Sequence, residues 1–554
     1  MLLMAACAPG AGVPASGGDG PQASTPRSSK PFVFIARSEP GDLGRTGGVG
    51  IDTTPRFFNA TLMIRDGQGA PQPQLATALP QLNSDTWRLF PDGRMETTYR
   101  LRPSLTWHDG TPFTASDLVF GWQVYSHPEL GTSGAPPQNL IEEASAPDPL
   151  TFVVQWRRPY PNAALLSEDF RPLPRHILEP HLRNLRAEVW DDLSFWRNDY
   201  VGLGAYRVDR WEPGAFVEGV AFDGYVFGRP KIDRMRVIFM QDPNTVTANL
   251  LSGSANLVAD ITIRFETGVI LKREWSSRGE RDGGTVNFTP AQVRYTFFQL
   301  RPDWAKPAAI TDIRVRKAIA HAIDKQALAD ALHGGEGIPT DVLVQKTAPL
   351  FATMDRAVTK YPSEPRRAQQ FMEEAGFAKG GDGFYAHPTE GRFEPEWRAT
   401  AGGDSELQVG VLTDALRRFG IDARSFLLPR PYDNQTRHTF PTMLNWSTTG
   451  QPDEWFTTYT AGKTPSAENR WTGNNGGGWF NAEYDRLAEA FATNLDQNQR
   501  NQLMVDMGRV LSDQVPIVPL YYNLDVVANT ASLRGVLVAP DGSIGFNVHD
   551  WEMI

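Results

Sequence analysis

The chain has 554 residues and a net charge of −10 at pH 7. This acidic balance excludes proteins that hold a nucleic acid by its phosphates, because such contacts need a positive field. The length exceeds what one hydrophobic core organises, so we expect about two to four structural units. No run of about 18 apolar residues follows the N-terminus, which excludes a membrane-spanning helix there.

The N-terminus carries the single cysteine of the chain, Cys7, directly after the apolar run Met1–Ala6. Small residues before a cysteine resemble the end of a bacterial lipoprotein signal, here shortened and without its basic start. We expect lipid attachment at Cys7, since about two or three acyl chains hold a protein on a membrane. Residues 8–30 are rich in Ala, Pro, Gly, Ser and Thr, which predicts a flexible tether. The alternative is a free thiol in an unfolded tail.

The first strong pattern of secondary structure lies between residues 94 and 125. Apolar and polar residues alternate from Met95 to Arg102, which predicts a half-buried strand. The segment Trp107–Thr111 predicts a turn, with a positive φ at Gly110. Thr114 is followed three residues later by Asp117, which predicts the capped start of a helix.

Helices and strands alternate in the rest of the chain. Apolar spacings, caps and glycine stops predict helices over 312–322, 324–334, 365–376 and 406–419 and a helical pair over 481–511. Strands are predicted over 421–427 and 517–522. The alternation assigns the chain to the α/β class.

Several motifs follow one another in the order found in a known family. They are Tyr99–Asp117 with its Trp107-His108-Asp109-Gly110-Thr111 centre, Pro172–Leu178, Val201–Tyr206, Trp211–Gly214, Asp242–Thr245, Leu250–Gly253 and Val315–Asp324. Together they resemble the extracytoplasmic solute-binding proteins of family 5, which are the oligopeptide-, dipeptide- and nickel-binding subunits of ABC importers.

The resemblance implies a two-lobed periplasmic-binding-protein fold of type II, with a hinge and an inserted extra domain. The implied parts are the shortened signal and tether over 1–30, a discontinuous first lobe over 31–65, 190–290 and 515–554, an inserted domain over 66–189, and a second lobe over 291–514. In this family the lobes close over the ligand, and contacts made only in the closed state drive the closure.

The resemblance also implies the function. A monomer without cofactor, lipid-anchored at Cys7 in the periplasm or on the outer face of the cytoplasmic membrane, would capture a small peptide-like or glycoside-like solute. It would deliver that solute to an ABC permease and its ATPase, and would bind no nucleic acid. The alternative is a sensory or chaperone-like binding protein that uses the same fold.

Catalytic and metal sites are not predicted. We interpret His108 and Asp109 as a turn in which His108 hydrogen-bonds its own loop. The other histidines are scattered, and without a cysteine partner a zinc site is not expected, although nickel carried as a chelate stays open. The sequence contains no Gly-x-Ser-x-Gly or His-Glu-x-x-His motif and no phosphate-binding glycine loop. We therefore expect no enzyme, although a hydrolase with dispersed catalytic residues is the alternative.

The segment Asn445–Phe480 is the most informative for ligand binding, because it holds four of the 15 tryptophans. Aromatic plates between glycine-rich polar loops suit a cleft in which flat apolar faces stack and polar groups fix orientation. The alternative is that these tryptophans belong to the core of a lobe. The predicted ligand-binding residues are Trp446, Ser447, Thr448, Thr449, Trp455, Trp471, Asn474 and Trp479.

The expected solute follows from one substitution relative to the family. In its peptide-binding members, an aspartate shortly after the matching tryptophan pairs with the α-ammonium of the peptide. Here that position falls on Thr448 or Thr449, and neither carries a charge. A buried ammonium needs a carboxylate partner, so we expect weak binding of ordinary free peptides. Oligosaccharides, opine-like compounds and peptides with a blocked amine stay open.

Overall fold

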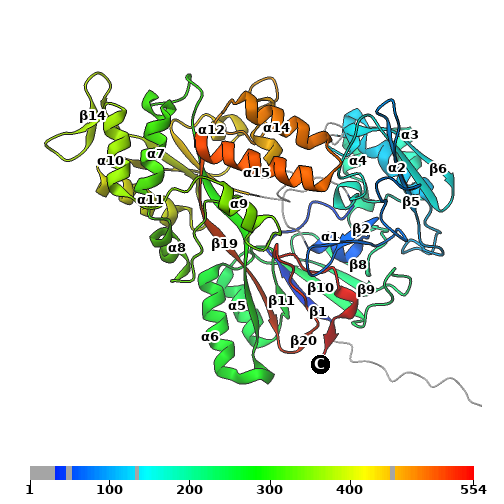
Figure 1. Cartoon of the computed structure of the whole chain (residues 1–554). Coiled ribbons are helices and arrows are strands. Elements are labelled where there is room, and N and C mark those ends of the chain that lie inside the picture. Colours follow the sequence, from blue (N-terminus) through cyan, green and yellow to red (C-terminus); the bar gives the residue numbers. More distant parts are fainter. Residues whose placement is uncertain (1–30, 45–52, 131–135, 449–455) are drawn as a thin grey trace, which may run out of the picture. The chain divides into compact units, whose positions relative to one another are not determined.

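A computed structural model describes residues 31–44, 53–130, 136–448 and 456–554 (Figure 1). The predicted lipidation site Cys7 and tether, and the predicted ligand-binding residues Thr449 and Trp455, lie outside these ranges. The described residues belong to one compact unit that starts at Pro31.

A ten-stranded mixed sheet organises this unit. Its strands are, in order, β17 (Arg424–Leu428), β16 (Glu396–Thr400), β18 (Met443–Ser447), β12 (Gly284–Phe298), β19 (Ile517–Thr530), β11 (Leu257–Val258), β1 (Phe32–Ala36), β10 (Arg234–Phe239), β9 (Phe216–Ala221) and β8 (Tyr206–Glu212). The central pair, β12 and β19, is antiparallel from Gly284 opposite Thr530 to Phe297 opposite Ile517. These two strands join two flanks of the sheet that come from different parts of the chain.

Helices cover both flanks (Figure 1). They are α1 (Thr54–Phe58), α2 (Ala115–Tyr125), α3 (Arg175–Arg183), α4 (Ala187–Asp191), α5 (Pro243–Ser252), α6 (Phe265–Asp282), α7 (Ile313–Ala322), α8 (Lys325–His333), α9 (Phe351–Ala357), α10 (Pro365–Glu374), α11 (Ser405–Phe419), α12 (Asn434–His438), α14 (Ala482–Thr493) and α15 (Gln497–Gln514). Helix α6 packs on the central strands, where Gly268 leaves room for Phe288 and Val526.

Smaller sheets complete the fold. They are β4 (Trp87–Leu89), β5 (Met95–Arg100), β7 (Thr151–Trp156) and β6 (Ile141–Asp148), then β2 (Met63–Arg65) with β3 (Pro71–Pro73), then β13 (Ala378–Lys379), β14 (Tyr385–His387) and β15 (Gly391–Arg392), and then β20 (Leu533–Arg534) with β21 (Glu552–Met553). The four-stranded sheet falls within residues 66–189, the range expected for an inserted domain. The domain boundaries themselves stay a prediction.

Local signals in the sequence predicted several of the elements. In β5, the side chains of Met95, Thr97 and Tyr99 are buried, as the alternation predicted. Helix α2 begins with the predicted capping box, in which the Thr114 N–H donates to Asp117 Oδ2 at 2.8 Å. The predicted strand that starts at Ile517 continues to Thr530, because its second half keeps pairing with β12.

The hydrogen bonds of His108 differ from the expectation. His108 does not bond its own loop. Its Nδ1 accepts from the Gly202 N–H at 3.1 Å, and its Nε2 lies 3.1 Å from the Gly204 carbonyl oxygen. A Cβ atom on Gly204 would clash with the main chain at Phe58 and Asn59, so only glycine fits there. The motif around His108 therefore fastens the 202–204 loop against α1, and Asp109 bonds His176 at 2.7 Å.

Burial lowers the pKa of His108 to about 4, so the folded protein holds this imidazole neutral at pH 7. The unfolded chain has the higher pKa and binds the extra proton, so this stability contribution is complete above about pH 6.5 and is lost as the pH falls toward 4. The shift corresponds to about 3 kcal/mol.

We predict that His108→Ala lowers the free energy of unfolding by about 2–4 kcal/mol at pH 7, because two buried hydrogen-bonding groups lose their partner. Urea unfolding at several pH values measures this. Between pH 6.5 and 4, the free energy of unfolding of the variant should fall less than that of the natural protein. His181→Ala, on the exposed surface of α3, is the control. An unchanged stability of the His108 variant would contradict the account.

Candidate functional site

The two flanks of the large sheet point the carboxyl ends of their parallel strands toward each other. In open α/β sheets ligands bind outside these ends. On one flank, β16 ends before residues 401–404 and β18 ends at Ser447. On the other flank, β11 ends before residues 259–264. The segments that follow β11 and β16 are in direct contact, which places a candidate site where the flanks meet.

An ion pair makes this contact. Arg264 Nη1 donates to Asp404 Oδ1 at 2.7 Å, and each side chain is about one third exposed. Gly403, with φ of +73°, gives the guanidinium room, because a Cβ atom there would lie 2.8 Å from Arg264 Nη2. Next to it, the Phe265 ring centroid lies 5.1 Å from that of His333. The contact therefore links residues that directly precede α6 and α11, one from each flank.

The end of β18 forms a wall beside the central strands. Trp446 lies opposite Tyr295, and its ring centroid is 6.3 Å from that of Phe297. The Trp446 side chain is half-buried, and the Arg437 guanidinium lies 4.4 Å above its ring. Ser447 lies opposite Arg294 of β12. We call Trp446, Ser447 and Thr448 the β18 wall.

Thr448 is tied to the central strand. Its N–H donates to the Val293 carbonyl oxygen at 2.9 Å, and its Oγ1 accepts from the Val293 N–H at 2.9 Å. The residue is buried, and its hydroxyl is occupied by this hydrogen bond to the backbone. Thr448 is therefore neutral and held by the backbone. That it, or Thr449, occupies the position of the acid in the peptide-binding members stays a prediction.

The other predicted residues that the structure describes, Trp471, Asn474 and Trp479, do not belong to β18. Trp471 contacts Trp304 edge-on at 5.6 Å, and Asn474 is exposed. Trp479 is buried and packs on Tyr484 at 5.0 Å, in the core shared with α14 and α15. Trp446 lies at the border of that same core. The structure thus brings Trp446, Ser447 and Thr448 together, and ligand contact by any of the predicted residues stays a prediction.

The prediction from sequence missed two arginines, one on the wall and one near it. Arg437 covers Trp446, and Arg301 donates to the carbonyl oxygens of Pro465 at 2.9 Å and Gly476 at 3.0 Å. Arg301 also lies 4.4 Å above the Trp304 ring, and burial lowers its pKa to about 10. Arg430 and Arg437, shortly before the tryptophan-rich segment, were the available signal for Arg437, and no local pattern indicated Arg301.

Arginine charges act on two titratable groups behind the wall. Burial lowers the pKa of His438 to about 3, with further lowering by Arg437 and Arg301. Burial would raise the pKa of Tyr432, but hydrogen bonds from Thr400 and Arg437, together with nearby arginine charges, lower it overall. The lowered pKa values favour the neutral form of His438 and ease deprotonation of Tyr432.

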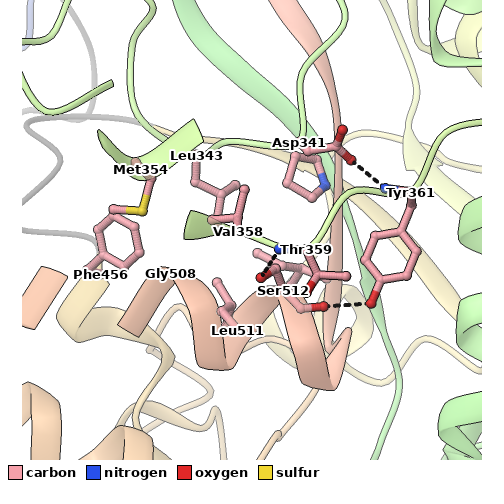
Figure 2. Close-up of a pocket in the computed structure, with 12 residues that line it drawn as sticks. Asp341, Leu343, Met354, Val358, Thr359, Tyr361, Phe456, Gly508, Leu511 and Ser512 are labelled. Carbon is pink, nitrogen blue, oxygen red and sulfur yellow. Dashed lines mark hydrogen bonds between the residues drawn. The ribbon is translucent and has the colours of Figure 1, made fainter. Parts of the chain in front are cut away.

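A separate cavity lies between α9, α15 and β19 (Figure 2). Its lining includes Leu343, Met354, Val358 and Leu511, and it is closed on one side where the Tyr361 hydroxyl donates to the Ser512 carbonyl oxygen at 2.8 Å. The space open to the centre of a water molecule is about 20 Å³. That volume suits a single water molecule, so this cavity is too small for a peptide or a sugar.

Two further properties of the described ranges bear on the site. Their helices include none that is both long and apolar enough to cross a membrane. Their histidine, cysteine, aspartate and glutamate side chains include no group of three placed to bind one metal ion.

Comparison with known proteins identifies the family. Residues 71–469 match the model of the bacterial extracellular solute-binding proteins, family 5. The chain belongs to this family. A putative ABC transporter peptide-binding protein of Brucella ovis is 26% identical over 53% of this chain and 51% of its own length. The alignment therefore spans about half the length of that relative. The oligopeptide-binding protein AppA of Bacillus subtilis is 22% identical over 83% of this chain and 81% of its own length.

Solved structures of low sequence identity share the fold. The NikZ protein of Campylobacter jejuni, in complex with Ni(L-His), has a TM-score of 0.75 and 19% identity, and covers 95% of this chain and 100% of its own. The oligopeptide-binding protein of Thermus thermophilus, complexed with a pentapeptide, has a TM-score of 0.74 and 21% identity over 94% of this chain and 96% of its own. These likenesses confirm the two-lobed α/β fold.

We predict that Arg264→Gln and Asp404→Asn show a coupling energy of about 0.5–1 kcal/mol in a double-mutant cycle, as a partly exposed ion pair does. Urea unfolding at low and high salt measures it, and the coupling should shrink in high salt. The matched control is the exposed pair Arg418 and Asp414 within α11, which should couple less. Equal coupling in both cycles would contradict a special contact between the flanks.

Proposed function

We propose that this chain is the solute-binding subunit of an ABC importer, and that it captures a small polar solute between the two flanks of its large sheet. Membership of family 5 supports the class of function. The observation that carries the proposal is the contact of Arg264 with Asp404, because it joins the carboxyl-end segments of both flanks across the central strands. A rotation about β12 and β19 would open and close the space beside this contact.

The proposed role is binding and not catalysis. The family consists of solute-binding proteins, and the curated relatives AppA of Bacillus subtilis and the dipeptide-binding protein of Escherichia coli carry names of binding proteins. We infer that a membrane permease and its ATPase take over the solute. This also favours import over the sensory or chaperone-like alternative.

We further propose that the protein works outside the cytoplasm as a monomer, anchored by a lipid at Cys7 and extended from the membrane by the tether over 8–30. The support is the cysteine after a short apolar run and the composition of the segment that follows. Radiolabelled palmitate incorporated by the natural protein and not by Cys7→Ala would test the anchor.

We predict that Trp446→Ala weakens binding of the co-purified solute by about 1–3 kcal/mol, because a half-buried aromatic plate is lost. Isothermal titration with solute recovered from the native host measures the change. The control is Trp122→Ala, which removes a half-buried tryptophan from α2. Unchanged affinity in the Trp446 variant would assign this side chain to the core.

We also predict that free dipeptides and tripeptides bind only weakly, since Thr448 offers no carboxylate to an α-ammonium. Calorimetry with a panel of unblocked peptides tests this, and thermal unfolding of the same samples shows that the protein is folded. Micromolar or tighter binding of an unblocked peptide would contradict it.

A further inference from the structure

Arg437 presents a cation at the β18 wall without an acidic partner. Its guanidinium lies 4.4 Å above the Trp446 ring, and Nη2 lies 3.1 Å from His438 Nε2. Among the residues that the structure describes, no carboxylate is within ion-pairing distance of Arg437. Its Nε is buried and has no hydrogen-bond partner there. The loss of water around this guanidinium is therefore only partly compensated.

Other arginines of this region have carboxylate or carbonyl partners, which Arg437 lacks among the described residues. Arg398 pairs with Glu396 at 2.7 Å, and Arg301 donates to main-chain carbonyl oxygens. Arg294, opposite Ser447 on β12, resembles Arg437, because its Nε is also buried without a partner. Of the described residues, none forms an ion pair with Arg294. Tyr295, and not Arg294, lies opposite Trp446, so Arg294 points to the other face of the sheet. There its charge lowers the pKa of the buried Asp525. Arg437 is therefore the cation that lies at Trp446.

This arrangement favours an oxyanion. A guanidinium binds a carboxylate or phosphate through two parallel hydrogen bonds, and stacking on a tryptophan ring fixes the plane in which it presents them. An ammonium at the same place would meet positive charge and would find a neutral hydroxyl at Thr448 in place of an acid. Burial is the main cause of the lowered pKa of His438, and the charges of Arg437 and Arg301 lower it further.

We propose that the solute is anchored at the β18 wall by a carboxylate or a phosphate held by Arg437 on the face of Trp446, and that it presents no free ammonium to this wall. The proposal rests on the proposed function and narrows its substrate class to organic anions.

Affinity selection tests the proposal. Purified protein, stripped of bound solute by reversible unfolding, is mixed with three dipeptide libraries and with sugar phosphates, and retained compounds are identified by mass spectrometry. The first library is N-acetylated with a free carboxylate, the second is amidated with a free amine, and the third is blocked at both ends. We expect retention of N-acetylated carboxylates or sugar phosphates, with the two sources distinguished by their masses.

Variants assign the effect to Arg437. For the best retained anion, Arg437→Gln should weaken binding by about 10–100-fold, as loss of a charge-assisted bidentate contact does. Arg437→Lys should recover part of it, because the charge returns without the planar fork. Arg430→Gln, which removes an exposed cation seven residues earlier, is the control and should change affinity by less than about threefold.

Several results would overturn the inference. Retention of amidated or doubly blocked dipeptides in preference to anions would do so while leaving the proposed function intact, and so would equal anion binding by Arg437→Gln. The acids Asp453 and Glu454 lie outside the described residues. If one of them neutralised Arg437, then Asp453→Asn with Glu454→Gln would strengthen anion binding, which also contradicts the proposal. Retention of no compound, together with no solute from host extract, would overturn both the inference and the proposed function.

Discussion

The antiparallel pairing of β12 with β19 is the constraint on which the rest of the structure depends. These strands run side by side through the middle of the large sheet, with β18 bonded on one side and β11 on the other. Two register shifts near Pro290 and Arg294 interrupt the ladder at the point where the flanks meet. Such irregularities increase local twist and bending. The strand pair therefore joins the flanks and also provides the place where they turn relative to each other.

The chemistry of the candidate site follows from the same strands. The Val293 carbonyl oxygen of β12 accepts from the Thr448 N–H, and the Val293 N–H donates to the Thr448 hydroxyl. Arg294 lies opposite Ser447. Thr448, one of the two positions at which the resemblance places an acid, is thus neutral and is held by the backbone. The acid Asp404 is engaged by Arg264, and the buried Asp525 lies close to Arg294. Among the described residues, Arg437 beside Trp446 has no acidic partner, and this cation is the basis of the proposed anionic solute.

Local signals were enough to predict the capped helices and the alternating strand β5, because caps and periodicity act within a few residues. They were not enough for β12, where Thr289, Pro290 and Gln292 interrupt the apolar pattern and long-range pairing supplies the stability. The partners of His108 lie more than ninety residues away, so its own loop gave no indication of them. The contact of Arg437 with Trp446 likewise depends on how α12 leads into β18.

Amide hydrogen exchange, compared between the protein with its co-purified solute and the same protein after stripping, tests the central claim most directly. If the solute is held between the two flanks, protection should increase at Trp446–Thr448 and 401–404 on one flank and at 259–264 on the other. Helices α2 and α3 should exchange equally in both samples. Protection confined to one flank, or centred on the cavity around Tyr361 and Ser512, would contradict the account.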